Sequence, residues 1–167
     1  SVDTTGTGTV TVDAITADDV INASEAGGTV AVTGTTGGEL AEGDSVSFTV
    51  NGTDYSATVA ADGSWSADVA GSDLAADTAF TVTATGTDDA GNPISVTADS
   101  THSVDTTGTG TVTVDSITAD DVINASEAGG TVAVTGTTGG ELAEGDSVSF
   151  TVNGTDYSAT VAADGSW

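Results

Sequence analysis

The residues that could do chemistry in this sequence are carboxylates and amides gathered in short polar segments. These segments lie between apolar stretches and hold Asp18, Asp19, Asn22 and Glu25; Glu39, Glu42 and Asp44; Asp73 and Asp77; and Asp88, Asp89 and Asn92. A hard cation such as Ca²⁺ takes about six to eight oxygen ligands from carboxylate, amide and backbone carbonyl groups, which such segments can supply. The alternative is that acidic loops only keep the protein soluble, and composition alone leaves both interpretations open.

The charge balance excludes several classes of function. The 167 residues include 26 Asp and Glu, no Lys or Arg, and one His, for a formal net charge of −26. Without cationic side chains the chain has no means of binding the phosphates of nucleic acid or the headgroups of an anionic membrane. Its carboxylates also repel one another unless cations come from solution. We therefore expect no nucleic-acid partner and no membrane insertion, and no apolar run is long enough to span a bilayer.

Enzymatic and direct ligand-binding functions are the two competing classes. The only histidine, His102, follows a Thr-rich strand, and we expect it to be solvated in a linker rather than catalytic. Asp18 and Asp19 are adjacent on one loop, where their side chains tend to point apart, so they are a poor pair for acid–base work. Alternate threonines from Thr7 to Thr11 allow direct binding of ice or carbohydrate as an alternative function, although threonine is also common on the wet face of any strand.

The sequence is a tandem repeat. Residues 103–167 reproduce residues 1–65, so that Ser103 repeats Ser1, and the only difference is Ser116 in place of Ala14. The repeat has the length of a small autonomous domain. We predict a complete repeat with its linker over residues 1–105 and a truncated second copy over residues 106–167. The N-terminus carries no signal-peptide pattern and resembles the start of a fragment of a longer protein.

Apolar residues alternate with Thr, Ser and Asp throughout the first repeat, which is typical of half-buried β-strands. Turn signals such as Asn51-Gly52 and Asp62-Gly63 lie between these segments. The pattern predicts an all-β fold, a seven-stranded immunoglobulin-like β-sandwich repeated in tandem. The seven segments contain Val10 and Val12; Val30 and Val32; Val46, Phe48 and Val50; Tyr55, Ala57 and Val59; Trp65, Ala67 and Val69; Phe80, Val82 and Ala84; and Ile94, Val96 and Ala98.

An odd number of strands places the two ends of such a domain at opposite poles. We expect residues 16–28, 51–53 and 71–78 at one pole with the end of the last strand. Residues 37–44, 60–63 and 86–93 are expected at the other pole, beside the N-terminus. Tandem copies would then join pole to pole as a monomeric rod.

Two motifs carry a resemblance to a known family. Val12 to Glu25 has the pattern V-D-x-I-T-x-D-D-x-I-N-x-x-E, and Thr87 to Asn92 reads T-D-D-A-G-N. With the V-D-T-T linker and the repeat length, they resemble the bacterial immunoglobulin-like extender repeats of giant repeats-in-toxin (RTX) adhesins, ice-binding adhesins among them. The resemblance covers the whole chain.

The resemblance implies a structural role rather than an enzyme. Repeats of that family are spacers on the bacterial cell surface, in adhesins anchored at the outer membrane, and they bind Ca²⁺ within domains and at linkers. It implies neighbouring identical repeats and calcium ions as partners. The matching candidate ligands are Asp3, Asp13, Asp18, Asp19, Asn22, Glu25, Asp88, Asp89, Asn92 and Asp105, with Asp115, Asp120, Asp121, Asn124 and Glu127 in the second copy.

Overall fold

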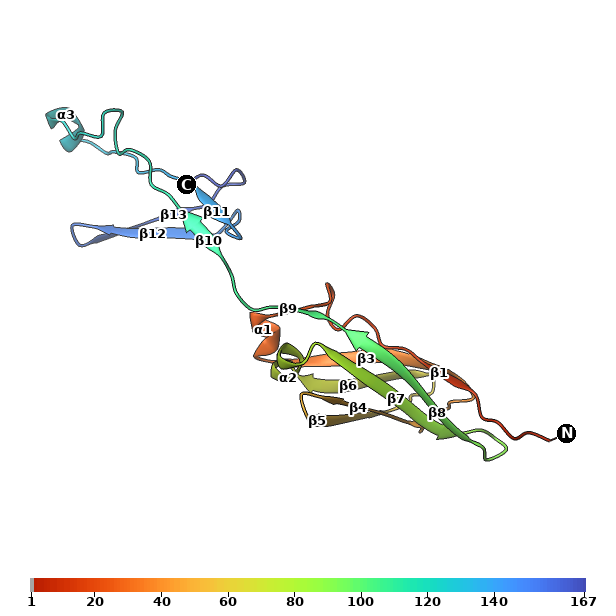
Figure 1. The fold of residues 1–167 in the computed structure, drawn as a ribbon. Coiled ribbons are helices and arrows are strands. Elements are labelled where there is room, and N and C mark those ends of the chain that lie inside the picture. Colours follow the sequence, from red (N-terminus) through yellow and green to blue (C-terminus); the bar gives the residue numbers. More distant parts are fainter. Residues whose placement is uncertain (1) are drawn as a thin grey trace. The chain divides into compact units, whose positions relative to one another are not determined.

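The computed structural model describes residues 2–167 and divides the chain into two compact units. The first unit is Ser1–Thr107 and the second is Gly108–Trp167 (Figure 1). Each unit is described by itself. None of the helices in the described residues has the length and hydrophobicity needed to cross a membrane.

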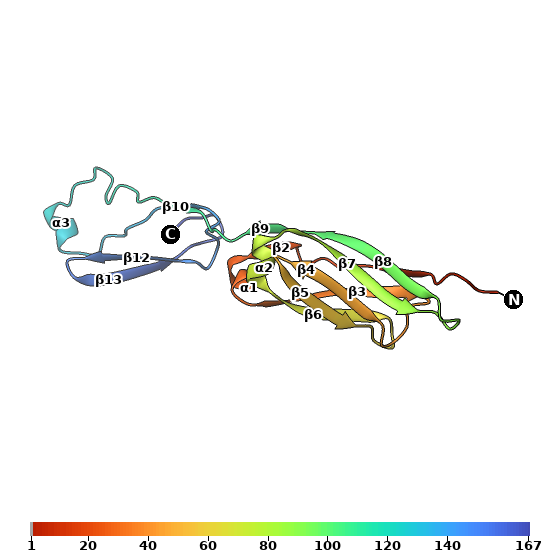
Figure 2. The same cartoon turned by 60° about the horizontal axis from the view of Figure 1, so that its bottom comes forward.

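In the first unit, two antiparallel sheets pack face to face (Figures 1 and 2). One sheet has the order β1-β3-β6, with β1 at Gly8–Val10, β3 at Thr29–Gly38 and β6 at Ser64–Ala70. The other has the order β5-β4-β7-β8, with β4 at Ser45–Val50, β5 at Thr53–Thr58, β7 at Ala79–Thr87 and β8 at Pro93–Thr101. The predicted all-β sandwich is thus confirmed.

The core lies between the sheets, where the alternation in the sequence places it. In β4, Val46, Phe48 and Val50 are buried while the serines and threonine between them are exposed. The Phe48 ring lies 5.8 Å from the ring of Tyr55, 6.0 Å from that of Trp65 and 5.3 Å from that of Phe80, measured between centroids. Because these aromatic residues come from four different strands, Phe48 connects both sheets.

A glycine in β3 allows the chain to cross close to the Trp65 indole. The indole Nε1 donates a hydrogen bond of 3.2 Å to the Thr11 carbonyl oxygen. A Cβ at Gly34 would lie 2.0 Å from that same oxygen and 2.7 Å from Nε1. Only glycine therefore fits at this crossing.

The described residues of the first unit form nine strands rather than the seven that the sequence predicted. The additional strands, β2 (Val20–Asn22) and β9 (Ser103–Asp105), are paired in parallel. Two short helices, α1 (Ala23–Ala26) and α2 (Gly71–Ala76), were not predicted either. Elements of three to six residues are too short to show a strand or helix period.

The prediction that His102 is solvated was wrong. Its side chain is 8% exposed, and its Nε2 donates a hydrogen bond of 2.8 Å to the Leu74 carbonyl oxygen. His102 lies between β8 and β9. Because β9 pairs with β2, the chain remains packed against the sandwich at this point. The residue is therefore part of the core edge, beside the Phe80 ring at 6.4 Å, rather than part of a free linker.

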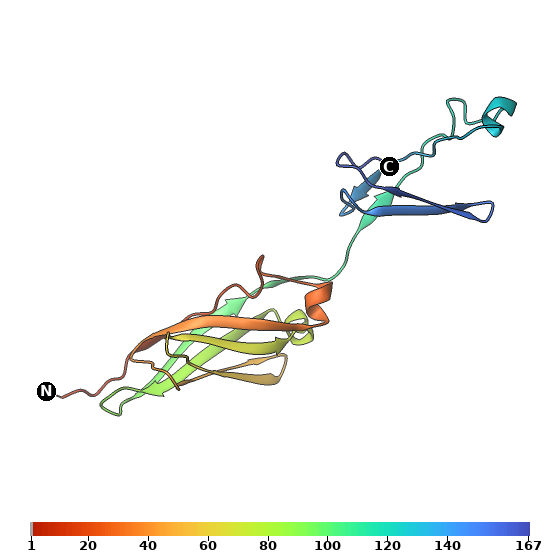
Figure 3. The same ribbon diagram turned by 180° about the vertical axis from the view of Figure 1, so that it is seen from behind.

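The second unit repeats part of the local structure of residues 8–65. It contains β10 (Gly110–Val112), α3 (Ala125–Ala128), β11 (Thr138–Gly140), β12 (Ser147–Val152) and β13 (Thr155–Thr160). β12 and β13 form a hairpin with the same register as β4 and β5, drawn in blue in Figure 3. β10 pairs with β11 in the register of β1 and β3.

Candidate metal site

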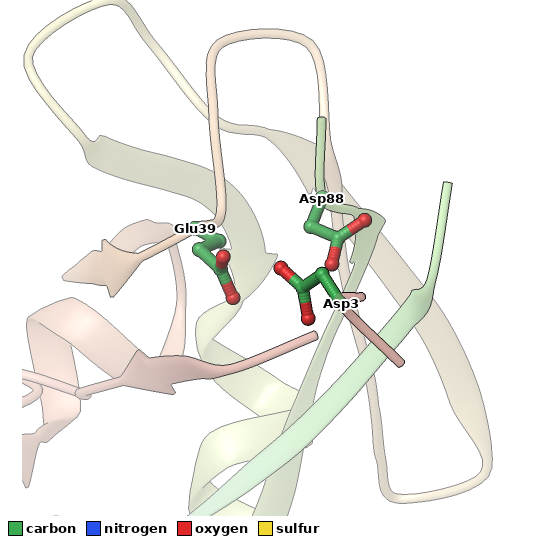
Figure 4. A group of neighbouring side chains, drawn as sticks. All are labelled: Asp3, Glu39 and Asp88. Atoms are coloured by element: carbon green, nitrogen blue, oxygen red, sulfur yellow. The ribbon is translucent and has the colours of Figure 1, made fainter. Parts of the chain in front are cut away.

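Three carboxylates converge at one end of the first unit (Figure 4). Asp3 precedes β1, Glu39 directly follows β3, and Asp88 directly follows β7. One carboxylate oxygen from each lies within 4.8 Å of the other two. Among the described residues, this is the single group of three acidic or histidine side chains at such short range.

Hydrogen bonds from backbone amides and from side chains hold Glu39 and Asp88 in place. The Thr7 amide and hydroxyl donate to Glu39 Oε2 at 2.7 and 2.8 Å. The Asn92 amide donates to Asp88 Oδ1 and its side-chain Nδ2 donates to Asp88 Oδ2, both at 2.7 Å. Gly91, with a φ of +87°, makes the tight turn between Asp88 and Asn92. The site is therefore built by the β7–β8 hairpin, the loop after β3 and the segment before β1.

The electrostatics of the site favour a bound cation. The side-chain hydrogen bond from Asn92 lowers the pKa of Asp88, while burial acts in the opposite direction. Asp88 is thereby kept ionised although it is only 7% exposed. With no Lys or Arg in the chain, a cation from solution is needed to offset three adjacent negative charges. Carboxylate oxygens are the ligands that Ca²⁺ prefers.

The structure brings together only part of the set predicted from sequence. Asp3 and Asp88 meet, whereas Asp89 is exposed and Asn92 serves as a hydrogen-bond donor to Asp88. Glu39 lies in one of the acidic segments named from the sequence, but it was not in the ligand set that the family resemblance implied. Its position in the sequence could have indicated its role, because residues 37–44 were expected at the same pole as residues 86–93.

The remaining candidates before and around α1 make structural hydrogen bonds. The Asp18 carboxylate accepts a hydrogen bond of 2.9 Å from the Thr16 hydroxyl, and this bond lowers the pKa of Asp18. The Asp19 carboxylate accepts a hydrogen bond of 3.0 Å from the Ile15 amide, and the backbone of Asp19 has a φ of +59°. Asn22 and Glu25 form a capping box on α1. Asp13 Oδ2 accepts from the Thr33 hydroxyl at 2.7 Å. The second copy repeats these arrangements at Asp115, Asp120, Asp121, Asn124 and Glu127.

Asp105 lies in β9, where its Cα is paired with that of Asn22 in β2. Its Oδ1 accepts a hydrogen bond of 3.2 Å from the Thr107 amide. The parallel pairing therefore places the predicted linker carboxylate next to the α1 capping box.

A second acidic network stabilises the other end of the first unit. The Tyr55 hydroxyl donates to Asp73 Oδ2 at 2.6 Å, and Asn51 Nδ2 donates to Asp73 Oδ1 at 3.1 Å. The hydrogen bond from Tyr55 lowers the pKa of Asp73 the most, and that from Asn51 lowers it further. The bond between Tyr55 and Asp73 also raises the pKa of Tyr55. Asp73 thus ties α2 to the β4–β5 hairpin.

We expect the contribution of Asp73 to depend on pH. Its pKa is lower in the folded state than the ordinary 3.8, so the stability it provides is present above that value. That stability is lost as the pH falls through the lowered pKa. Urea unfolding of wild type and Asp73→Asn should differ most at pH 7 and converge in acid. Asp68→Asn serves as the control, because Asp68 is exposed and its carboxylate accepts no hydrogen bond from the described residues. A difference for Asp73→Asn that is constant with pH would contradict the assignment.

Two antiparallel sheets in the orders β1-β3-β6 and β5-β4-β7-β8 define an immunoglobulin-like β-sandwich. No protein-family model and no curated protein sequence matches the chain. Solved structures do match. A bacterial immunoglobulin-like domain from the Marinomonas primoryensis ice-binding adhesin is 62% identical, with all of that domain and 62% of this chain covered and a TM-score of 0.57. The chain belongs to the family of bacterial immunoglobulin-like adhesin domains.

Two longer adhesin structures match nearly the whole chain. One is from a Ca²⁺-stabilised adhesin that helps an Antarctic bacterium reach out and bind ice, at 62% identity, a TM-score of 0.80 and 99% of this chain. The other is from a 1.5-MDa bacterial ice-binding adhesin studied for host cell surface retention, at 54% identity, a TM-score of 0.84 and 96% of this chain. The chain spans 40% and 52% of the length of these two structures.

Proposed function

We propose that this chain is an extender of a bacterial surface adhesin: tandem immunoglobulin-like repeats that act as a spacer and hold a distal binding domain away from the cell. The observation that carries this proposal is the repeat itself. Residues 103–167 copy residues 1–65 with one substitution. Such repetition suits a segment whose function is to add length to the protein. The structures that it resembles are adhesin domains rather than enzymes, and the proposal assigns no reaction to the chain.

The proposal includes calcium as the ion that stabilises the repeats. It is supported by the convergence of Asp3, Glu39 and Asp88 and by the description of one similar adhesin as Ca²⁺-stabilised. The carboxylates of the α1 loop and Asp105 are further candidate ligands, as the sequence predicted. Backbone carbonyls and water would complete the coordination.

The proposed setting is the outside of a bacterial cell, in a protein anchored at the outer membrane. The similar structures come from bacterial adhesins, and one of them was studied for retention at a cell surface. We propose that the repeats act as a monomer whose partners are neighbouring repeats and calcium ions.

Small-angle scattering on proteins with increasing numbers of complete repeats tests the spacer role. In Ca²⁺ we expect the maximum dimension to grow linearly with the number of repeats, and in EDTA to grow less steeply. For freely jointed repeats, the end-to-end distance grows as about the square root of the number of repeats. Asp105→Ala at every joint, compared with Asp99→Ala on the exposed face of β8, should reduce the slope in Ca²⁺. Square-root growth in both Ca²⁺ and EDTA would refute a stiff spacer.

A further inference from the structure

The turn between β4 and β5 contains a dipeptide that can react with itself, Asn51-Gly52. The glycine amide nitrogen can attack the side-chain amide carbon of the asparagine, because glycine has no side chain to hinder the approach. A bond forms between these two atoms, the bond to Nδ2 breaks, and the glycine proton leaves with Nδ2 as ammonia. Water then opens the resulting succinimide ring to give aspartate or isoaspartate. The other asparagines of the first unit, Asn22 and Asn92, precede alanine and proline.

The attacking nitrogen is free in the folded protein. Asn51 and Gly52 are both exposed, and a Cβ added to Gly52 would meet no atom within 4 Å. The Gly52 amide donates no hydrogen bond to the described residues. In the turn at Asp62-Gly63, by contrast, the glycine amide donates to the Ala60 carbonyl oxygen at 2.9 Å. The β4–β5 turn therefore does not protect its own nucleophile.

The group that is attacked is held by α2. Asn51 Nδ2 donates a hydrogen bond of 3.1 Å to Asp73 Oδ1, and the Asn51 backbone amide donates one of 3.0 Å to Asp77 Oδ2. Asp73 is fixed in turn by the Tyr55 hydroxyl at 2.6 Å. Ring closure requires the Asn51 side chain to rotate toward Gly52, and the nitrogen that leaves is the atom bonded to Asp73. This hydrogen bond must therefore break for the reaction to proceed.

We propose that Asn51 is a deamidation site, that Asp73 holds its reaction back in the folded protein, and that the reaction releases α2 from the β4–β5 hairpin. Water is the co-reactant and ammonia the leaving group. The product carries a carboxylate where Asn51 has a donor, so Asp73 loses a hydrogen bond and faces a like charge at short range. The network of Tyr55, Asp73 and Asn51 is thus open to an irreversible covalent change.

Mass spectrometry of the whole chain after incubation in mildly alkaline buffer tests the proposal. A Glu-specific protease separates Asn51 from its copy Asn153, because no Glu lies between Glu42 and Glu127. Fragmentation of the products then locates each modified asparagine. We expect Asn51 of the wild type to react at least about tenfold more slowly than the same residue in a free peptide of residues 48–56.

Asp73→Ala should remove most of this difference in rate, whereas Asp68→Ala, at an exposed position of β6, should preserve it. Amide hydrogen exchange at Val46 and Val82, both fully buried, reports whether the first unit of each variant is folded. Equal rates in the wild type and the free peptide would overturn the proposal. So would an unchanged slow rate in folded Asp73→Ala.

An exchange of donor and acceptor tests the same contact without deleting it. Asn51→Asp has the charge of the product and should lower the urea midpoint of the first unit. Adding Asp73→Asn places a donor opposite the new carboxylate and should recover part of the loss. Adding Asp68→Asn removes a charge elsewhere and should recover less. A midpoint of Asn51→Asp equal to that of the wild type, or equal recovery by the two second substitutions, would contradict the proposed consequence of deamidation.

Discussion

Phe48→Ala is expected to lower the free energy of unfolding of the first unit by about 3–5 kcal/mol, the usual cost of truncating a buried phenylalanine. Phe48 is 5% exposed and lies between the rings of Tyr55, Trp65 and Phe80. Removing the ring leaves a cavity at the point where the two sheets meet. Urea dependence of amide hydrogen exchange, followed at the amide of Val82, reports the change for this unit alone.

The chain contains its own control for this substitution. Phe150 is the copy of Phe48 and contacts Tyr157 and Trp167, but it lies in the second unit and is only partly buried. We expect Phe150→Ala to leave the unfolding of the first unit unchanged. A Phe48→Ala variant that unfolds like wild type would contradict the assignment of Phe48 as the centre of the core.

Calcium should raise the melting temperature of the first unit, and Glu39→Gln should remove most of that increase. An ion that binds only the folded state stabilises it by about 2.7 kcal/mol when its concentration is a hundredfold above Kd. Glu39→Gln keeps an acceptor for Thr7 but removes one of three charges in the cluster of Asp3, Glu39 and Asp88. Calorimetric melting in Ca²⁺ and in EDTA measures the difference.

Glu141→Gln is the matched control for the calcium experiment. Glu141 is the copy of Glu39 and accepts from the Thr109 hydroxyl as Glu39 does from that of Thr7, yet the described residues place no third carboxylate beside it. This variant should retain the full effect of Ca²⁺ on the first unit. If sodium chloride or Mg²⁺ restores the melting temperature in EDTA as well as Ca²⁺ does, the acidic residues act only by reducing repulsion.

The sandwich could be predicted because its strands are long enough to show their period. Val46, Phe48 and Val50 alternate with polar residues, and a strand with one buried face tolerates no shift of register. Asn51 and Gly52 then fix the turn, with φ values of +49° and +78° in the structure. Local chemistry alone determines such a hairpin.

Features that depend on distant contacts could not be predicted. The burial of His102 and the strand β9 both follow from the parallel pairing with β2, which joins residues about 80 positions apart and leaves no local pattern. Likewise, the meeting of Asp3, Glu39 and Asp88 depends on three loops whose geometry no spacing in the sequence specifies. The sequence indicated that the ligands are carboxylates and at which end of the domain they gather, but not which three residues meet.

The parallel pairing of β2 with β9 determines how the first unit responds to mechanical force. β2 follows β1 in the N-terminal part of the unit, β9 lies at the end of the unit, and the two strands run in the same direction. Tension applied between the ends of the unit pulls the strands past each other, so that their hydrogen bonds bear the load together in shear. A hairpin pulled at its open end would instead separate one bond at a time. Three residue pairs, Val20–Ser103, Ile21–Val104 and Asn22–Asp105, therefore resist extension in shear, and on the N-terminal side the pairing of β1 with β3 carries load ahead of them.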